Sequence, residues 1–178
     1  AKHRRVSLHR DMLFFNRNEI PFEELMNNED YIIQPYITGR EFTVAVIPDA
    51  AGQGSICLHP MEILPDDGRA MYVAGQNYGT TLKKFQPEIN SNLYKKMTEG
   101  VLTLHKALGI KGMSRTDVRV FEDEIYVLDI NTMPNLDTNR SYLPAIIIHN
   151  GYTMSSLIER LINFAGVWYE KNHNKEMA

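Results

Sequence analysis

The chain has 178 residues, 43% of them hydrophobic, and a net charge of -3, so it can bury the core of one domain and has no general attraction to nucleic acid. Cys57 is its single cysteine, which excludes an intrachain disulfide and favours a reducing, cytoplasmic location. No apolar run reaches the length of a membrane span and no signal-peptide pattern opens the chain, so no membrane partner is expected.

The first thirty residues carry few structural signals. Residues 12–15 could form a short strand, and Pro21 is well placed to begin a short helix that ends near Asn27. The basic residues at the start are typical of a solvated surface, with a phosphate or nucleic-acid contact as the minor alternative. The chain starts at Ala1 and not at Met, so we expect it to be a piece of a longer protein.

The middle of the chain predicts strands and then a long loop. Alternating apolar residues indicate strands over 31–34 and 40–47, a turn over 48–54 and a returning strand over 55–63. Glycines and polar residues dominate from 64 to 86, which predicts a long loop, and such loops are usually functional or mobile.

The second half predicts three helices around a hairpin. Apolar residues recur every three or four positions from 87 to 108, a short helix is expected over 141–149, and a last helix starts at Thr153. Two runs rich in β-branched and apolar residues, 115–121 and 125–131, predict a β-hairpin. We therefore predict an α+β fold in which an antiparallel sheet has helices packed on one face.

The hairpin, within residues 112–134, is the most informative stretch. A three-residue turn centred on Asp123 would place Asp117 opposite Asp129 and Arg115 opposite Asn131. Side chains alternate between the faces of a strand, so a second set would form the core face: Val118, Val120, Tyr126, Leu128 and Ile130.

Two facing carboxylates need a physical reason, because directly opposed Cβ atoms are only about 4.5–5.5 Å apart and like charges there destabilise a sheet. One reading is a cation between Asp117 and Asp129, with Asn131 as a neutral oxygen donor on the same face. Oxygen ligands of this kind suit Mg²⁺. A second reading is a pair of solvated acids neutralised by Arg115 and Arg119, and a third is that one of the two carboxyl groups is protonated. Geometry alone leaves these readings open.

Sequence motifs favour the cation. The run GMSRTDVRVFEDEIYVLDINTMP, continued by NLDTNRSYLPAI, resembles the catalytic signature of the D-alanine:D-alanine ligase branch of the ATP-grasp enzymes. Upstream, IIQPYITGREFTVAVI resembles the adenine-linker strand of that family, and GYTMSSLIERLINFA resembles its last helix. The resemblance implies an ATP-grasp C-terminal lobe, with residues 31–178 as the catalytic domain and residues 1–30 as a remnant of the preceding nucleotide-binding lobe or a poorly matched segment.

The resemblance also implies which residues form a ligase site. Arg115 would stabilise the tetrahedral intermediate, or else simply form a salt bridge across the hairpin. The magnesium ligands, with Mn²⁺ as an alternative ion, would be Asp117, Asp129 and Asn131.

The remaining implied residues bind the nucleotide and the second substrate. Glu41 would bind the ribose of ATP, and its alternative is a surface acid. The linker from Gln34 to Ile37 would bind adenine. Ser141 and Tyr142 would meet the carboxylate of the second substrate at a helix start, although Ser141 could be a plain N-cap.

The implied function is ATP-dependent joining of a carboxylate to an amine through an acyl phosphate, in peptidoglycan precursor synthesis. D-alanine or a related amino acid would be the substrate, and a homodimer is a candidate assembly. Two departures from the family stand out: Asp129 replaces a glutamate, and residues 73–78 lack the usual loop lysine, for which Lys83 or Lys84 are candidates. The alternative is a degenerate ATP-grasp nucleotide-binding module without ligase activity, and a protein-interaction domain is a weaker one.

Overall fold

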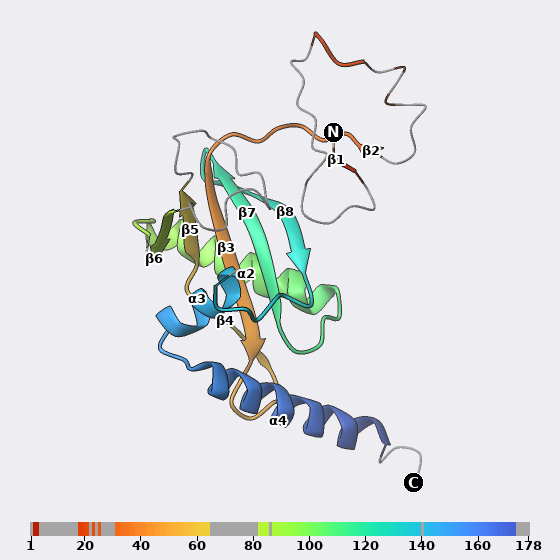
Figure 1. The fold of residues 1–178 in the computed structure, drawn as a ribbon, viewed down its shortest axis with the longest axis vertical. Coiled ribbons are helices and arrows are strands. Elements are labelled where there is room, and N and C mark those ends of the chain that lie inside the picture. Colours follow the sequence, from red (N-terminus) through yellow and green to blue (C-terminus); the bar gives the residue numbers. More distant parts are fainter. Residues whose placement is uncertain are drawn as a thin grey trace.

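A β-sheet with helices packed against it forms the body of the molecule (Figure 1). The computed structural model describes residues 2–3, 18–21, 23, 25, 31–64, 82–85, 87–139 and 141–173. In this part of the chain six strands form an antiparallel sheet in the order β6-β5-β3-β7-β8, with β4 also paired to β3. The strands are β3 (Arg40–Pro48), β4 (Ser55–Cys57), β5 (Met61–Leu64), β6 (Leu82–Phe85), β7 (Ser114–Phe121) and β8 (Glu124–Asn131).

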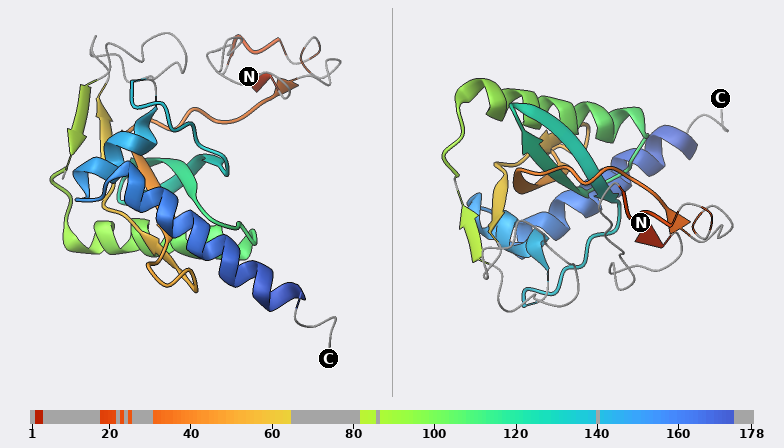
Figure 2. Two further views of the ribbon diagram at one scale, coloured as in Figure 1. Left: turned by 60° about the horizontal axis from the view of Figure 1, so that its bottom comes forward. Right: turned by 90° about the horizontal axis from the view of Figure 1, so that it is seen from above.

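Helices cover both faces of this sheet, as the two views of Figure 2 show. The side of β3 that carries Phe42, Val44 and Val46 packs against α2 (Ser91–Ala107). The opposite side, with Ala45 and Ile47, packs against α3 (Tyr142–His149) and α4 (Met154–His173). The predicted α+β class is confirmed, but the helices are not confined to one face, because β3 is apolar on both sides and each side needs a cover.

Within the described residues most of the predicted strands and helices are present, with several differences. The returning strand divides into β4 and β5, since Pro60 between them has no backbone N–H to pair. β6 lies inside the predicted long loop, and the two-residue strands β1 (Lys2–His3) and β2 (Tyr31–Ile32) form a separate pair. Of the predicted early helix, Glu23 and Leu25 are helical, while the predicted strand over 12–15 lies outside the described residues.

The hairpin turn is tighter than predicted. Glu122 and Asp123 both have positive φ, 51° and 62°, so the turn has two residues, as in type I′, whose twist matches that of the strands. Val118 then pairs with Val127, but a bulge beyond it restores the predicted register, and Asp117 pairs with Asp129. The two-residue turn pairs Tyr126 with Arg119, and the bulge leaves Leu128 without a partner in register. Both side chains are 38% exposed, so their predicted place in the core is wrong.

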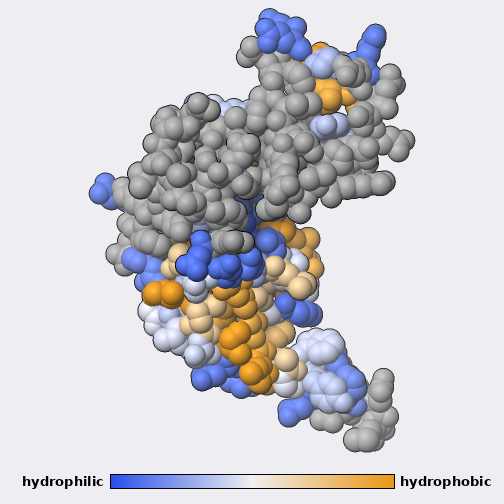
Figure 3. Space-filling model, in the orientation of Figure 1, coloured by the Kyte–Doolittle hydropathy of each residue, from blue (hydrophilic) through white to orange (hydrophobic). Residues whose placement is uncertain are grey.

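The outer side of α4 is partly apolar. Its inner side is anchored by fully buried Leu157, whereas Ile158 and Ile162 are exposed. Figure 3 shows apolar surface over the first part of this helix and hydrophilic surface toward its C-terminal end. Among the described helices, none combines the length and the apolar character that crossing a lipid bilayer requires.

Gly39, just before β3, provides a test of the close approach between β3 and β7. Its φ is +118°, and an added Cβ would lie 2.0 Å from the carbonyl oxygen of Val120. We expect Gly39→Ala to destabilise the protein by about 1–3 kcal/mol or more through this strain. Gly100, inside α2, has no atom within 4 Å of an added Cβ, so Gly100→Ala should stabilise by about 1 kcal/mol. Thermal unfolding of the intact protein measures both, and equal effects of the two substitutions would contradict the prediction.

Candidate active site

The β7–β8 hairpin brings four of the predicted site residues together on one face of the sheet. Asp117 lies opposite Asp129 and Arg115 lies opposite Asn131, as predicted. α3 and α4 pack against this face near Ala45 and Ile47 of β3, and neither helix crosses β8 there (Figure 1). The two facing aspartates therefore lie beside the helix-covered part of the face.

Arg115 and Asp117 form an ion pair along β7. The guanidinium Nε and Nη2 donate to Oδ1 and Oδ2 of Asp117 at 3.1 and 2.9 Å. The side chains are only 12% and 20% exposed, and such two-point pairs are among the stronger charged hydrogen bonds. The guanidinium also lies 5.8 Å from the ring centroid of Tyr142 in α3. This arrangement combines two of the sequence readings: an arginine neutralises one aspartate while the pair remains face to face.

Asp129 and Asn131 supply the remaining oxygens. Asp129 is half-buried, and its side chain makes no hydrogen bond or ion pair within the described part of the chain. The side-chain Oδ1 of Asn131 accepts a hydrogen bond from the backbone N–H of Met133 at 3.0 Å, which orients the amide. Two carboxylates and an amide oxygen fit a hard cation such as Mg²⁺, which usually completes its shell with water and phosphate. The described residues contain no group of three or more His, Cys, Asp or Glu side chains suited to a metal ion.

Glu41 is joined to β7 and to the linker that precedes β3. It lies opposite Arg119 in register, and Arg119 Nη2 donates to Glu41 Oε2. Burial raises the pKa of Glu41, and the charge of Arg119 opposes that shift. Arg119 Nη1 also donates to the carbonyl oxygen of Ile37 at 2.8 Å, while Gln34, earlier in the linker, is exposed. The structure therefore brings Glu41 and Ile37 together through Arg119.

Ser141 and Tyr142 lie at the start of α3. Ser141 is the N-cap, and its hydroxyl accepts a hydrogen bond from the backbone N–H of Leu143 at 3.4 Å. Tyr142 is only 2% exposed and belongs to the core cluster. The N-cap reading of Ser141 is therefore observed, and the contact of this pair with a substrate stays a prediction.

A buried histidine–serine pair was not predicted from the sequence. His105 of α2, 1% exposed, makes a 2.7 Å hydrogen bond through Nδ1 with the hydroxyl of Ser114. Ser114 is the first residue of β7 and directly precedes Arg115, so this bond fixes the start of the strand that carries the site. The sequence signal for this pair was a histidine on the apolar side of a predicted helix, followed by a serine at the start of a predicted strand. This signal is weak, because neither the spacing nor the residue types predict that the two side chains are in contact.

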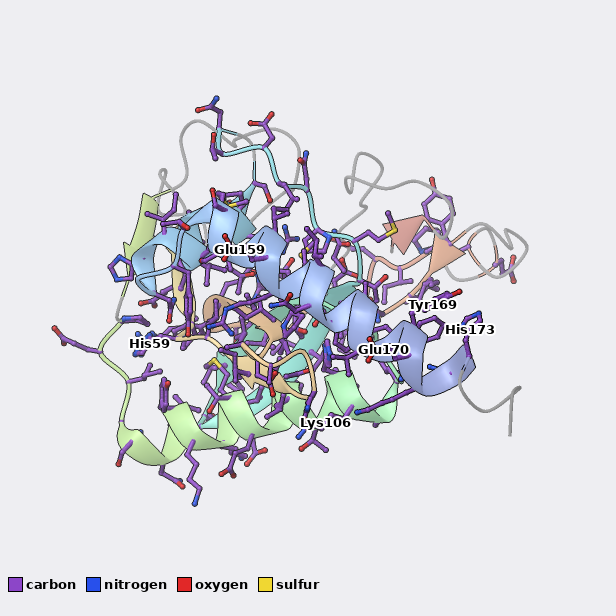
Figure 4. All side chains as sticks on the ribbon, turned by 90° about the horizontal axis from the view of Figure 1, so that it is seen from below. His59, Lys106, Glu159, Tyr169, Glu170 and His173 are labelled. Atoms are coloured by element: carbon purple, nitrogen blue, oxygen red, sulfur yellow. The ribbon has the colours of Figure 1, made fainter. Side chains whose placement is uncertain are left out.

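A pocket that His105 helps to line lies apart from the predicted site residues. It has a volume of about 240 Å³ and lies between the end of α2, the β3–β4 turn and α4, with Lys106, Ser55 and Phe164 among its lining residues. Figure 4 labels Lys106 in this region, between the α2 and α4 ribbons. None of the predicted site residues lines this pocket, so it is not the candidate active site.

Comparison with known proteins identifies the family. Residues 18–163 match the family model described as D-ala D-ala ligase C-terminus. The chain belongs to this family. Its similarity to the D-alanine--D-alanine ligase of Bartonella bacilliformis is 30% identity over 155 residues, which is 82% of this chain and 48% of that protein. The corresponding enzyme of Petrotoga mobilis is 31% identical over 171 residues, 93% of this chain and 53% of the relative.

Solved structures of the D-alanine--D-alanine ligases have the same fold. The ligase from Bacillus anthracis complexed with ATP superposes with a TM-score of 0.59 at 23% identity, covering 77% of this chain and 41% of that chain. At this identity the likeness concerns the fold. The chain spans about half the length of the curated relatives it matches.

The His105–Ser114 bond generates a prediction about pH. Burial lowers the pKa of His105, so below a pH of about 6.5, the ordinary histidine value, the unfolded chain binds more protons than the folded one. The free energy of unfolding should therefore fall as pH decreases through this range, down to the lowered pKa of the folded state. His105→Leu should flatten this dependence, as measured by urea unfolding between pH 5 and pH 8. An unchanged slope in the variant would contradict the assignment.

Proposed function

We propose that this chain is the ATP-grasp catalytic portion of a D-alanine:D-alanine ligase that acts in peptidoglycan precursor synthesis. The observation that carries the proposal is the Asp117–Asp129 pair, held face to face with Arg115 on one of the two carboxylates. The family match to residues 18–163 supports it, as does the name shared by the relatives, D-alanine--D-alanine ligase.

The proposed reaction has two steps. The first D-alanine carboxylate takes the terminal phosphoryl group of ATP, which gives an acyl phosphate and ADP. The amine of the second D-alanine then attacks the acyl carbon, phosphate leaves, and the amine gives up a proton. A bound Mg²⁺, held by Asp117, Asp129 and Asn131, would screen the negative charge of the phosphates.

Arg115 is the proposed catalytic residue. Its guanidinium is already fixed by both oxygens of Asp117 and by the ring of Tyr142, so it needs no reorganisation to stabilise the oxyanion that forms during amine attack. Tyr142 is buried, so we assign it to supporting Arg115 and assign the carboxylate of the second substrate to the backbone N–H groups at the start of α3. Glu41 is assigned to the ribose of ATP, and the linker from Gln34 to Ile37 to adenine.

The proposal also covers the domain boundaries, the metal ion, the cellular location and the assembly of the protein. We assign residues 31–178 to the catalytic domain and residues 1–30 to the preceding lobe or a poorly matched segment. Mn²⁺ is the proposed substitute for Mg²⁺, the cytoplasm is the proposed location, and a homodimer is the proposed assembly, without a nucleic-acid or membrane partner. We assign the role of the lysine that contacts the phosphates to Lys83 or Lys84, whose side chains lie outside the described part of the structure.

Activity of the full-length protein tests the proposal. Phosphate release from ATP should depend on added D-alanine. Arg115→Met should lower kcat by about 10²- to 10³-fold, because it removes a fixed positive charge at the developing oxyanion. Asp129→Asn should raise the Mg²⁺ concentration that gives half-maximal activity, because it removes a carboxylate ligand. A coupled assay for phosphate measures all three quantities.

Lys96→Met is the matched control. Lys96 pairs with Glu124 at 2.8 Å at the turn end of the same hairpin, with both side chains well exposed, so its loss should change activity little. ATP binding without D-alanine-dependent phosphate release would reject the ligase proposal and leave a nucleotide-binding module. Equal losses in Arg115→Met and Lys96→Met would show that Arg115 acts only through folding.

A further inference from the structure

Arg119 of β7 connects strand β3 with two residues of the linker that precedes it. Besides its bonds to Glu41 and to the carbonyl oxygen of Ile37, its guanidinium lies 5.3 Å from the ring centroid of Tyr36. The arginine side chain is only 6% exposed and that of Glu41 11%. A buried arginine of β7 thus fixes both the end of the linker and the first carboxylate of β3.

The bonding pattern leaves part of Glu41 available. Arg119 donates to Oε2, and a carboxylate has two oxygens with about four acceptor positions. Oε1 can therefore accept further hydrogen bonds, such as those of two neighbouring hydroxyl groups, while Oε2 remains held. Arg119 Nε is buried and has no hydrogen-bond partner in the described part of the chain, so the guanidinium is not saturated by the contacts it makes.

We propose that Arg119 is the positioning residue of the nucleoside subsite: it holds Glu41 and the backbone of Ile37 in one rigid unit, so that the carboxylate faces the ribose and the linker faces the base. This inference rests on the proposed function, because that function assigns the ribose to Glu41. Arg119 itself contacts no substrate. Its loss should weaken ATP binding and leave the chemical step, at Arg115, nearly unchanged.

Arg119 also affects the protonation of Glu41. Burial raises the pKa of Glu41, nearby Asp117 adds to this, and Arg119 counteracts both. On its other side in the sheet, Glu41 pairs with Ile63 of β5, which carries no charge. Tyr126 of β8 pairs with Arg119 and not with Glu41. Without Arg119 the carboxyl group would take up a proton at higher pH, and it would then lose an acceptor for the ribose hydroxyls.

Steady-state kinetics of the full-length ligase test the inference. Arg119→Met should raise KM for ATP about 10- to 100-fold, the range for lost charged hydrogen bonds, while kcat changes by less than about threefold. KM for ATP in this variant should rise further as pH falls, with the wild type changing less. Arg119→Lys, which keeps the charge, should recover part of the affinity and remove most of the added pH dependence.

Arg40 offers a matched control from the neighbouring position of β3. It forms the same kind of pair, with Glu62 at 2.7 and 2.9 Å, and it stacks on Phe42, which points to the other face of the sheet. Arg40→Met should therefore lower the melting temperature but keep KM for ATP near the wild-type value. Equal increases of KM in Arg40→Met and Arg119→Met would overturn the inference.

A double-mutant cycle covers the case in which Arg119→Met is poorly folded. In a Glu41→Gln background, Arg119→Lys should have little further effect on KM for ATP, because the partner is already altered. Additive effects of the two substitutions would overturn the inference. Wild-type protein that fails to bind ATP would reject the proposed function together with this inference, whereas normal wild-type binding with unchanged KM in Arg119→Met would reject the inference alone.

Discussion

Repulsion between Asp117 and Asp129 is the constraint on which the site depends. The two-residue turn at Glu122 and Asp123 would by itself bring another pair into register, and the bulge before Asp129 restores the opposition of the two carboxylates. Bulges of this kind are frequent next to active sites, where they redirect a side chain. The hairpin thus keeps an arrangement that is unfavourable in an ordinary sheet.

The charges on this face explain why a cation would stabilise it. Glu41, Asp117 and Asp129 contribute three carboxylates, and Arg115 and Arg119 contribute two guanidinium groups, each paired with one acid. One negative charge, that of Asp129, is left without an ion pair among the described residues. A polyphosphate would meet the same excess negative charge, so a divalent ion between the two is the natural counter-charge. Charge balance and the family match thus point to the same chemistry.

Packing on both sides of β3 is what holds these charges in place. α2 supports one face of the sheet through Val44, Val118 and their neighbours, and its His105 anchors Ser114 beside Arg115. α3 and α4 cover the Ala45 end of the other face, and Tyr142 of α3 lies against Arg115. The helices thereby restrict the side chains at the edge of the site without covering the aspartates.

The sequence by itself determined the antiparallel hairpin and the main helices, because strand alternation and helix periodicity are local properties of neighbouring residues. The predicted opposition of Asp117 to Asp129 is confirmed, but the structure reaches it through a two-residue turn and a bulge and not through the predicted three-residue turn. Only the tertiary structure decided the two-residue turn, which pairs Tyr126 with Arg119, the bulge at Leu128, and the placement of helices on both faces of the sheet. It also decided the partners of the buried groups, Arg119 with Glu41 and Ile37, and His105 with Ser114. These partners are 9 to 82 residues apart in the chain, and side chains so far separated meet only after the sheet and helices have packed.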